Sequence, residues 1–164
     1  IAARMNFSVE EQKKIYYCGL LHDIGKISIA DEIINKNGSL TDSEYQEIKK
    51  HPVSGWNILH TIDEFPELAQ VARWHHERYD GRGYPDGKTG GEVPLYVRIV
   101  SIADAYDAMT SNRSYRSVME RSKVIRIIRE ESGKQFDPEV AEVFLKILEK
   151  DKNYEMREKN SLFK

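Results

Sequence analysis

The chain has little of several features that would assign it to a class. Among its 164 residues there is one cysteine, Cys18, so an internal disulfide is excluded, and the apolar surroundings favour a small buried side chain over a reactive thiol. No run approaches the roughly 18 apolar residues of a membrane span, and the first residues lack the apolar segment of a secretory signal. These absences predict a cytoplasmic protein and no membrane contact by this piece.

An excess of charge of either sign is also missing. Lys plus Arg number 25 and Asp plus Glu number 27, for a net charge of −2. No overall basic field therefore favours binding to long nucleic acid, and any recognition of phosphate must be local. With 40% hydrophobic residues, a chain of this length is expected to form one compact domain that buries roughly 70% of its unfolded surface.

No segment shows the two-residue alternation of β-strands, whereas helical apolar spacing is common. Helix starts are indicated by Ser8, Thr41 and Ser117, each followed three residues later by Glu, and by Asp137-Pro138. We expect an all-α fold, with residues 1–150 as one domain and residues 151–164 as a polar tail or an extra helix. The predicted helices cover residues 9–24, 41–60, 66–78, 94–111, 118–132 and 138–150, with short pieces at 2–5 and 30–35. Left-handed turns are expected at three glycines: Gly25, Gly38 and Gly133.

Histidines and aspartates stand together inside several of these apolar helical stretches. Buried without partners, such groups cost free energy, and a shared metal cluster removes that cost. Imidazole and carboxylate together bind borderline divalent metals, and a carboxylate that bridges two ions lets a bound water ionise near neutral pH. His51 precedes a proline, which predicts a bend within its helix. The candidate ligands are His22, Asp23, His51, His75, His76 and Asp104.

Other polar residues could serve the same site. Lys26, at a predicted helix exit, could face a phosphoryl oxygen or be a solvated lysine that the helix dipole favours. Asp107 could touch substrate, orient a ligand or bond within its helix. Arg113 and Arg116 offer planar forks for phosphate or guanine, or are exposed charges. The glycine-rich segment 79–94 is interpreted as a functional loop rather than a plain connection.

Taken in order, these blocks resemble the HD-GYP subgroup of HD-domain phosphohydrolases. The likeness extends to about residue 150. It implies a helical bundle of the HD-domain type that opens cyclic di-GMP to linear pGpG and, in some members, to GMP, at a centre of two or three iron or manganese ions. The matching blocks are HDIGK from His22, HP from His51, HHERYDGRGYP from His75, the run VPLYVRIVSIADAYDAM around Asp104, and NRSYR from residue 112.

Carried onto matching positions, the resemblance implies that the six candidate ligands hold metal and that Lys26, Arg113 and Arg116 hold phosphate. Gly83, Tyr84 and Pro85 would border the substrate entrance, on a loop linked in the family to docking of GGDEF-type domains. Family members supply further ligands upstream, but residues 1–7 contain neither His nor Glu. Either an unseen segment precedes the chain or its first metal position is incomplete, which leaves a third ion open. An upstream sensor or receiver domain and a homodimer are further expected partners.

The leading hypothesis is attack on phosphorus by a hydroxide that bridges the metals, with Asp23 and Lys26 as the catalytic residues. The main alternative is a catalytically silent cyclic di-GMP receptor or protein-docking module. A third reading, an HD phosphohydrolase acting on mononucleotides, is disfavoured by the glycine-rich loop and by NRSYR.

Overall fold

The computed structural model describes residues 1–111 and 118–156, and within these ranges every regular element is a helix. The all-α prediction is confirmed. The elements are the 3₁₀ turn η1 (Ala2–Met5), α1 (Val9–Leu21), the 3₁₀ turn η2 (Ile24–Ser28), α2 (Asp31–Ile34), α3 (Asp42–Ile48), α4 (His51–Leu59), α5 (Pro66–Trp74), the 3₁₀ turn η3 (Gly90–Glu92), α6 (Leu95–Thr110), α7 (Arg121–Glu130) and α8 (Pro138–Lys150).

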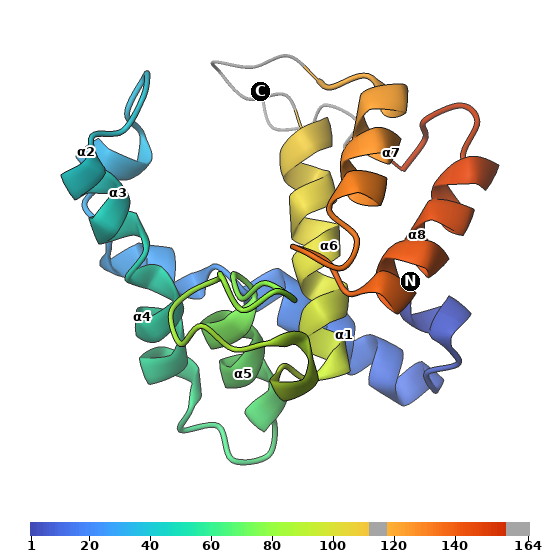
Figure 1. Ribbon diagram of the computed structural model, residues 1–164. Coiled ribbons are helices and arrows are strands. Elements are labelled where there is room, and N and C mark those ends of the chain that lie inside the picture. Colours follow the sequence, from blue (N-terminus) through green and yellow to red (C-terminus); the bar gives the residue numbers. More distant parts are fainter. Residues whose placement is uncertain (112–117, 157–164) are drawn as a thin grey trace.

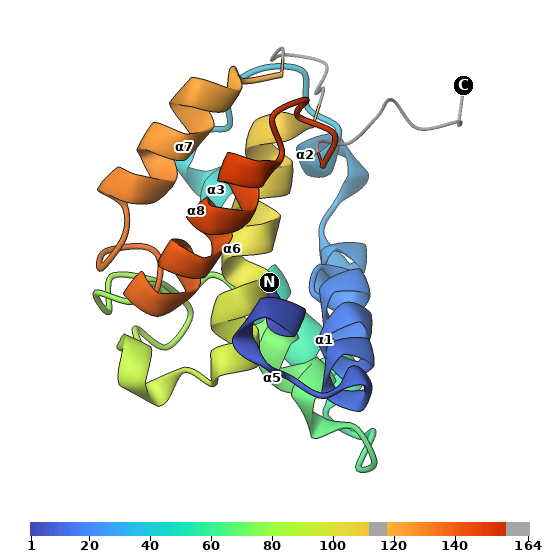
Figure 2. The ribbon, with the colours of Figure 1, turned by 90° about the vertical axis from the view of Figure 1, so that its right-hand side faces the viewer.

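The long helix α6 lies between α1, α4 and α5 on one side and α7 and α8 on the other (Figures 1 and 2). It contributes to an apolar core on each side. The first core joins α1, α4, α5 and one face of α6, where Val97 and Val100 are buried. The second joins α7, α8 and another face of α6, where Ile102 and Tyr106 are buried. Apolar residues of α6 thus face two directions, as expected for a helix enclosed by the protein. No helix in the described part of the chain is long and apolar enough to cross a membrane.

Helix starts follow the local rules read from the sequence. Reciprocal capping boxes form at Ser8 with Glu11 and at Thr41 with Glu44, and the Asp137 side chain caps α8. The third predicted box includes Ser117, which lies outside the described residues. Its helix, α7, begins at Arg121 with no side-chain cap, three residues later than predicted.

Two predicted helices are interrupted. The helix expected over 41–60 is wrong, because α3 ends at Ile48 and α4 starts at His51, with Pro52 in its first turn. Proline lacks an N–H and fits a first turn better than a helix interior, so it opens a new helix here instead of bending one. The helix expected over 9–24 also stops early, at Leu21, and continues as η2.

The glycine predictions are confirmed at two positions and wrong at the third. Gly38 and Gly133 have positive φ values of 125° and 78°. Gly25 has no left-handed φ and lies buried in η2, where a Cβ atom would collide with the backbone of His51 in α4. Residues 151–156, the described part of the predicted tail, form turns.

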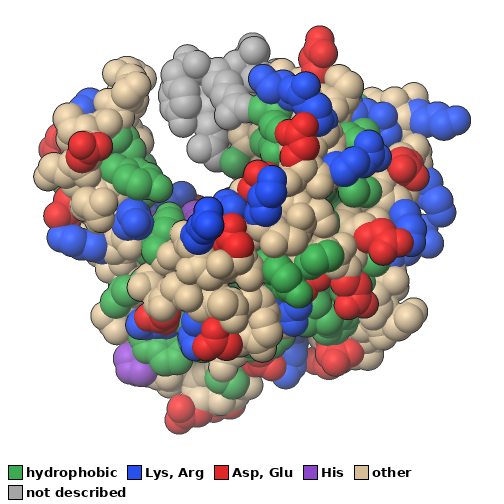
Figure 3. Space-filling model, viewed as in Figure 1, with side chains coloured by type: hydrophobic (Ala, Val, Ile, Leu, Met, Phe, Trp, Pro, Cys, Tyr) green, Lys and Arg blue, Asp and Glu red, His purple; other side chains and the backbone are tan. Residues whose placement is uncertain are grey.

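Helices α2 and α3 form an arm that rises from α4 and stands apart from α6 and α7 (Figure 1). Neither helix of the arm contains a buried residue. A deep hollow separates the arm from the rest of the molecule, and histidine is visible at its floor (Figure 3). The fold therefore places the histidine-bearing segments at the bottom of an open cleft.

Candidate metal centre

Most of the candidate ligands lie where a helix ends or begins. His22 and Asp23 link α1 to η2, His51 is the first residue of α4, and His75 and His76 follow α5. The last carbonyl groups of a helix have no partner within it, so they are free to accept hydrogen bonds from nearby side chains. Asp104 differs, because it projects from the middle of α6.

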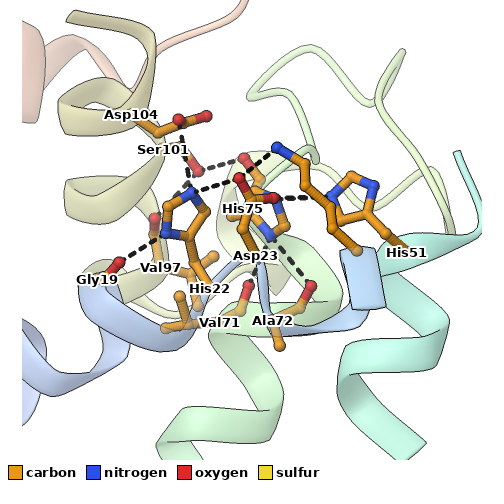
Figure 4. A network of polar contacts seen from close by, with 11 residues as sticks. Gly19, His22, Asp23, His51, Val71, Ala72, His75, Val97, Ser101 and Asp104 are labelled. Carbon is orange, nitrogen blue, oxygen red and sulfur yellow. Dashed lines mark hydrogen bonds and ion pairs between the residues drawn. The ribbon is translucent and has the colours of Figure 1, made fainter. Parts of the chain in front are cut away.

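Those free carbonyl groups orient three of the imidazole rings. Figure 4 shows these contacts for His22 and His75. Because a carbonyl oxygen can only accept, each Nδ1 donates, and Nε2 becomes the atom available to a metal ion. The partners of the Nδ1 atoms are the carbonyl oxygens of Gly19 for His22 at 2.6 Å, of Ile48 for His51 at 2.7 Å and of Ala72 for His75 at 3.0 Å.

The available nitrogen atoms converge on Asp23. Its Oδ1 lies 3.2 Å from His51 Nε2 and 3.7 Å from His75 Nε2, and these two nitrogen atoms are 3.2 Å apart. With His76, the group offers four ligand atoms that all lie within 4.8 Å of one another. Two Nε2 lone pairs at this separation repel each other unless a cation lies nearby. The arrangement therefore fits a metal ion better than a hydrogen-bonded core.

A second group of donors adjoins the first. His22 Nε2 lies 3.3 Å from Asp23 Oδ2 and 3.5 Å from Asp104 Oδ1. His22 Nε2 and Asp23 Oδ1 are buried without a hydrogen bond of good geometry. Asp23 thus presents one oxygen to each group, as a bridging carboxylate does. The mixed nitrogen and oxygen donors suit a divalent metal ion.

The carboxylates and the imidazoles shift one another's protonation. Burial alone would lower the pKa of His22, but the carboxylates of Asp104 and Asp23 outweigh it and raise this pKa to about 10. Burial would raise the pKa of Asp23, yet the three surrounding imidazoles and Lys26 hold it well below its usual value. Burial lowers the pKa of His75, and burial together with His75 lowers the pKa of His76 to about 3. His75 and His76 are thus neutral and Asp23 is ionised, which are the forms that bind metal, whereas His22 holds a proton that a metal ion would displace.

Close backbone packing sets these side chains in place. A Cβ atom at Gly25 would overlap the His51 carbonyl group, so only glycine lets η2 approach α4 and brings Asp23 beside His51. On the other side, Ser101 Oγ of α6 donates to the His75 carbonyl oxygen at 2.8 Å. The contact fixes the end of α5 against α6, the helix that carries Asp104.

The glycine-rich loop covers one side of the centre. Tyr84 stacks on the His76 ring with centroids 4.8 Å apart, and its backbone N–H donates to the His76 carbonyl oxygen at 3.2 Å. A Cβ atom at Gly83 would lie 2.6 Å from that same carbonyl oxygen, so glycine is required for this approach. Pro85 follows Tyr84 through a cis peptide bond. Gly83 and Tyr84 line a cavity of about 550 Å³ that also reaches His75, His76 and Asp104.

The remaining candidates are placed less uniformly, and their roles stay predictions. The Lys26 ammonium contacts Asp23 Oδ2. Lys26 does not line the large cavity but lines a neighbouring one of about 280 Å³. Asp107 is exposed and lines neither of these cavities. Arg113 and Arg116 lie outside the described residues.

Sequence reasoning missed two residues of the site. Glu77 is 5% exposed, and its carboxylate accepts hydrogen bonds from the backbone N–H groups of Asp86 at 2.7 Å, Gly87 at 3.1 Å and Lys88 at 3.0 Å. A glycine-rich loop has many backbone N–H groups that need hydrogen-bond acceptors. A nearby carboxylate could have been predicted from the sequence on that ground. Lys49 lines the large cavity from the end of α3. Its position in a polar run gave no such signal.

Comparison with known proteins agrees with this geometry. The profile of a family described as HD domain matches residues 1–140. A cyclic di-GMP phosphodiesterase of Thermotoga maritima is 40% identical over 163 residues, covering 98% of this chain and 44% of that protein. The cyclic di-GMP phosphodiesterase response regulator RpfG of Xanthomonas campestris is 38% identical, covering 89% and 39%. The 3'3'-cGAMP-specific phosphodiesterase 1 of Vibrio cholerae is also 38% identical, covering 89% and 34%.

The chain therefore spans less than half the length of these curated relatives. Among solved structures, a cyclic GMP-AMP phosphodiesterase of V. cholerae, V-cGAP3, superposes with a TM-score of 0.67 at 19% identity, covering 93% of this chain and 42% of that one. This likeness concerns the fold alone, and it agrees with the predicted HD-type bundle. The chain belongs to the HD-domain family, within its HD-GYP subgroup.

Proposed function

We propose that the chain is a metal-dependent phosphodiesterase that hydrolyses cyclic di-GMP, to pGpG and then to GMP. The observation that carries the proposal is the convergence of the His51 and His75 Nε2 atoms on one oxygen of Asp23, while the other oxygen faces His22. Relatives that cover most of this chain are named for hydrolysis of cyclic di-GMP.

The donor groups accommodate two divalent ions, Fe or Mn. Asp23, His51, His75 and His76 would hold one, and His22 and Asp104 would hold the second together with Asp23. A third ion would need ligands beyond these six residues. Bound ions would polarise a phosphoryl oxygen and lower the pKa of a coordinated water.

The protein's own groups act by holding and orienting. The carbonyl partners of the Nδ1 atoms keep each Nε2 turned inward, and burial of His51 and His75 excludes competing water. Lys26, beside Asp23, would neutralise charge on the equatorial oxygens of the phosphoryl group. Arg113 and Arg116 would hold phosphate, and Tyr84 with its two loop neighbours would border the entrance.

The wider setting of the chain is also a proposal. A location in the cytoplasm fits the buried lone thiol of Cys18. An upstream receiver or sensor domain is supported by the name of one relative, a response regulator, of which this chain spans 39%. GGDEF-type domains and a second copy of the chain are the further partners that we propose.

The proposal is tested with protein loaded anaerobically with Fe(II) or Mn(II) and then given cyclic di-GMP. Chromatography should detect pGpG and GMP, and mass spectrometry should find two ions per chain. Asp23→Ala should lower kcat by at least about a hundredfold, because removing even a residue that hydrogen-bonds to a metal ligand lowers metal affinity or activity 10–100-fold. His60→Ala is the control, because the hydrogen bonds of His60 within the described residues go to carbonyl oxygens of its own helix.

Equal turnover by Asp23→Ala would refute the proposed chemistry. Binding of cyclic di-GMP without turnover, in protein that holds its metals, would favour the receptor function instead. Parallel assays with 3'3'-cGAMP decide the base preference, because relatives of both named specificities match this chain at 36–41% identity.

A further inference from the structure

Lys49 lies in the part of the large cavity's wall that the arm forms. The proposed function does not use this residue. Lys49 follows the last residue of α3 and is partly buried. Its Nζ atom lies 4.7 Å from the centre of the Tyr84 ring and 5.8 Å from that of the Tyr45 ring, and all three residues line the cavity. The ammonium is thus held between two aromatic faces at the edge of the space that reaches the metal centre.

This ammonium has no carboxylate partner among residues 1–111 and 118–156, unlike Lys26 and Arg78. The Lys26 ammonium contacts Asp23, and Arg78, another residue of the cavity wall, is bound by both Asp80 and Glu131. The next residue, Lys50, pairs with Glu47 at 2.5 Å. Aromatic faces hold a cation in place without neutralising its charge. The charge of Lys49 therefore remains available to an anionic ligand.

The position of Lys49 relative to the centre is set by a stack of rings. The Lys49 ammonium lies 4.7 Å, and the centre of the His76 ring 4.8 Å, from the centre of the Tyr84 ring. Lys49 and the candidate ligand His76 thus contact the same tyrosine. The cavity, at about 550 Å³, is of the size that small-molecule ligands occupy.

A cyclic dinucleotide carries two phosphodiester groups on opposite sides of one macrocycle. When one of them lies at the metal ions, the other lies some distance along the cavity and still carries a full negative charge. We propose that Lys49 binds this second, non-reacting phosphodiester, so that it selects cyclic dinucleotides over substrates with a single phosphate. The inference rests on the proposed function and extends it.

The test compares wild type with Lys49→Met on two substrates. Methionine keeps an unbranched apolar chain that packs on both tyrosine rings, and it removes only the charge. The second substrate is bis(p-nitrophenyl) phosphate, which has one phosphodiester. We expect kcat/KM for cyclic di-GMP to fall at least about tenfold more than kcat/KM for bis(p-nitrophenyl) phosphate, mainly through KM, because a charge-assisted hydrogen bond is lost. The Kd for cyclic di-GMP should rise by a similar factor.

The matched control is Lys50→Met, the same substitution one residue later, at an exposed lysine that does not line the cavity. Its two kcat/KM values should keep the wild-type ratio. Equal losses on both substrates by Lys49→Met, or a KM and a Kd for cyclic di-GMP within twofold of wild type, would overturn the inference, since a lysine that only supports Tyr84 predicts one of these results.

Failure of the proposed function gives a different result. A wild-type protein that cleaves bis(p-nitrophenyl) phosphate and binds cyclic di-GMP without cleaving it would refute the hydrolysis, while the Kd comparison would still decide the role of Lys49. A wild-type protein that does not bind cyclic di-GMP would refute both.

Discussion

At the residue scale, Gly25 determines how closely η2 can approach α4. A methyl group at this position would overlap the His51 backbone, so Gly25→Ala must push the two segments apart. We expect a loss of at least about 2 kcal/mol in the free energy of unfolding, since overpacking against backbone cannot relax easily. Loss of bound metal should accompany it, because Asp23 would move away from His51. Thermal unfolding and metal analysis measure the two effects.

Gly19→Ala is the matched control for this substitution. Gly19 lies inside α1, and a Cβ atom there would meet no atom within 4 Å. Alanine at this position should stabilise the protein by about 0.5–1 kcal/mol, because it restricts the unfolded chain and favours the helix. Equal stability and metal content for wild type and Gly25→Ala would contradict the packing account.

The residues of the site differ in how far the sequence could predict them. The ligand histidines and aspartates could be found because ionisable pairs in apolar helical stretches need a partner, and the structure brings all six together. Lys49 could not, because its neighbours in the chain are polar and only the arm's position brings it to the cavity. Glu77 was not among the predicted residues, because its partners are backbone atoms about ten residues away.

At the scale of elements, the first turn of α3 depends on an ionised carboxylate. Lys36, at 2.6 Å, and the Thr41 cap lower the pKa of Glu44 from 4.5 to about 2. A folded pKa below the unfolded one means that this stabilisation is complete above about pH 4.5 and is lost as the pH falls towards 2. Hydrogen exchange of amides in residues 41–50 should therefore accelerate over this range, relative to that of Glu44→Gln.

Glu10→Gln provides the comparison for this prediction. Glu10 also lies in a first helical turn, that of α1, and its side chain has no hydrogen bond or ion pair in the described part of the chain. Its substitution should leave the pH dependence of exchange in residues 41–50 as in wild type. If the wild type and Glu44→Gln responded to pH in the same way, the capping account would be wrong.

Helix existence was predictable, and helix ends were less so. Apolar spacing continues through Lys49 and Lys50, so residues 41–60 were predicted as one helix, although the chain turns before His51-Pro52. The periodicity of apolar residues indicates which residues face the core, but it does not indicate where the backbone hydrogen bonds of a helix end. Beyond the early end of α1, Gly25 packs against α4, and local sequence patterns do not contain such contacts.

At the scale of the whole molecule, metal binding should raise stability. The donor atoms come from α1, α4, α5 and α6, so an unfolded chain cannot present them together and the ions bind the folded state alone. An ion at 100 times its Kd would add about 2.7 kcal/mol, or about 5–10 °C in Tm for a chain of this size. Calorimetry with and without Mn(II) measures the shift.

Asp23→Ala should reduce this Tm shift strongly, whereas His60→Ala should retain it. Chelator added to the loaded wild type should bring its Tm back to that of the metal-free protein. If neither Mn(II) nor chelator changed the Tm, the histidine cluster would be a metal-free core.

The place of Asp104 on α6 has a consequence for cooperativity. Five of the six candidate ligands belong to the half of the molecule built on α1, α4 and α5, while α6 also supports the packing of α7 and α8. A coordinate bond from a metal ion to Asp104 would therefore connect the two halves. Unfolding of α7 and α8 would release α6 and weaken this connection. The metal-bound protein should therefore unfold in one cooperative step, even where the metal-free protein unfolds in two.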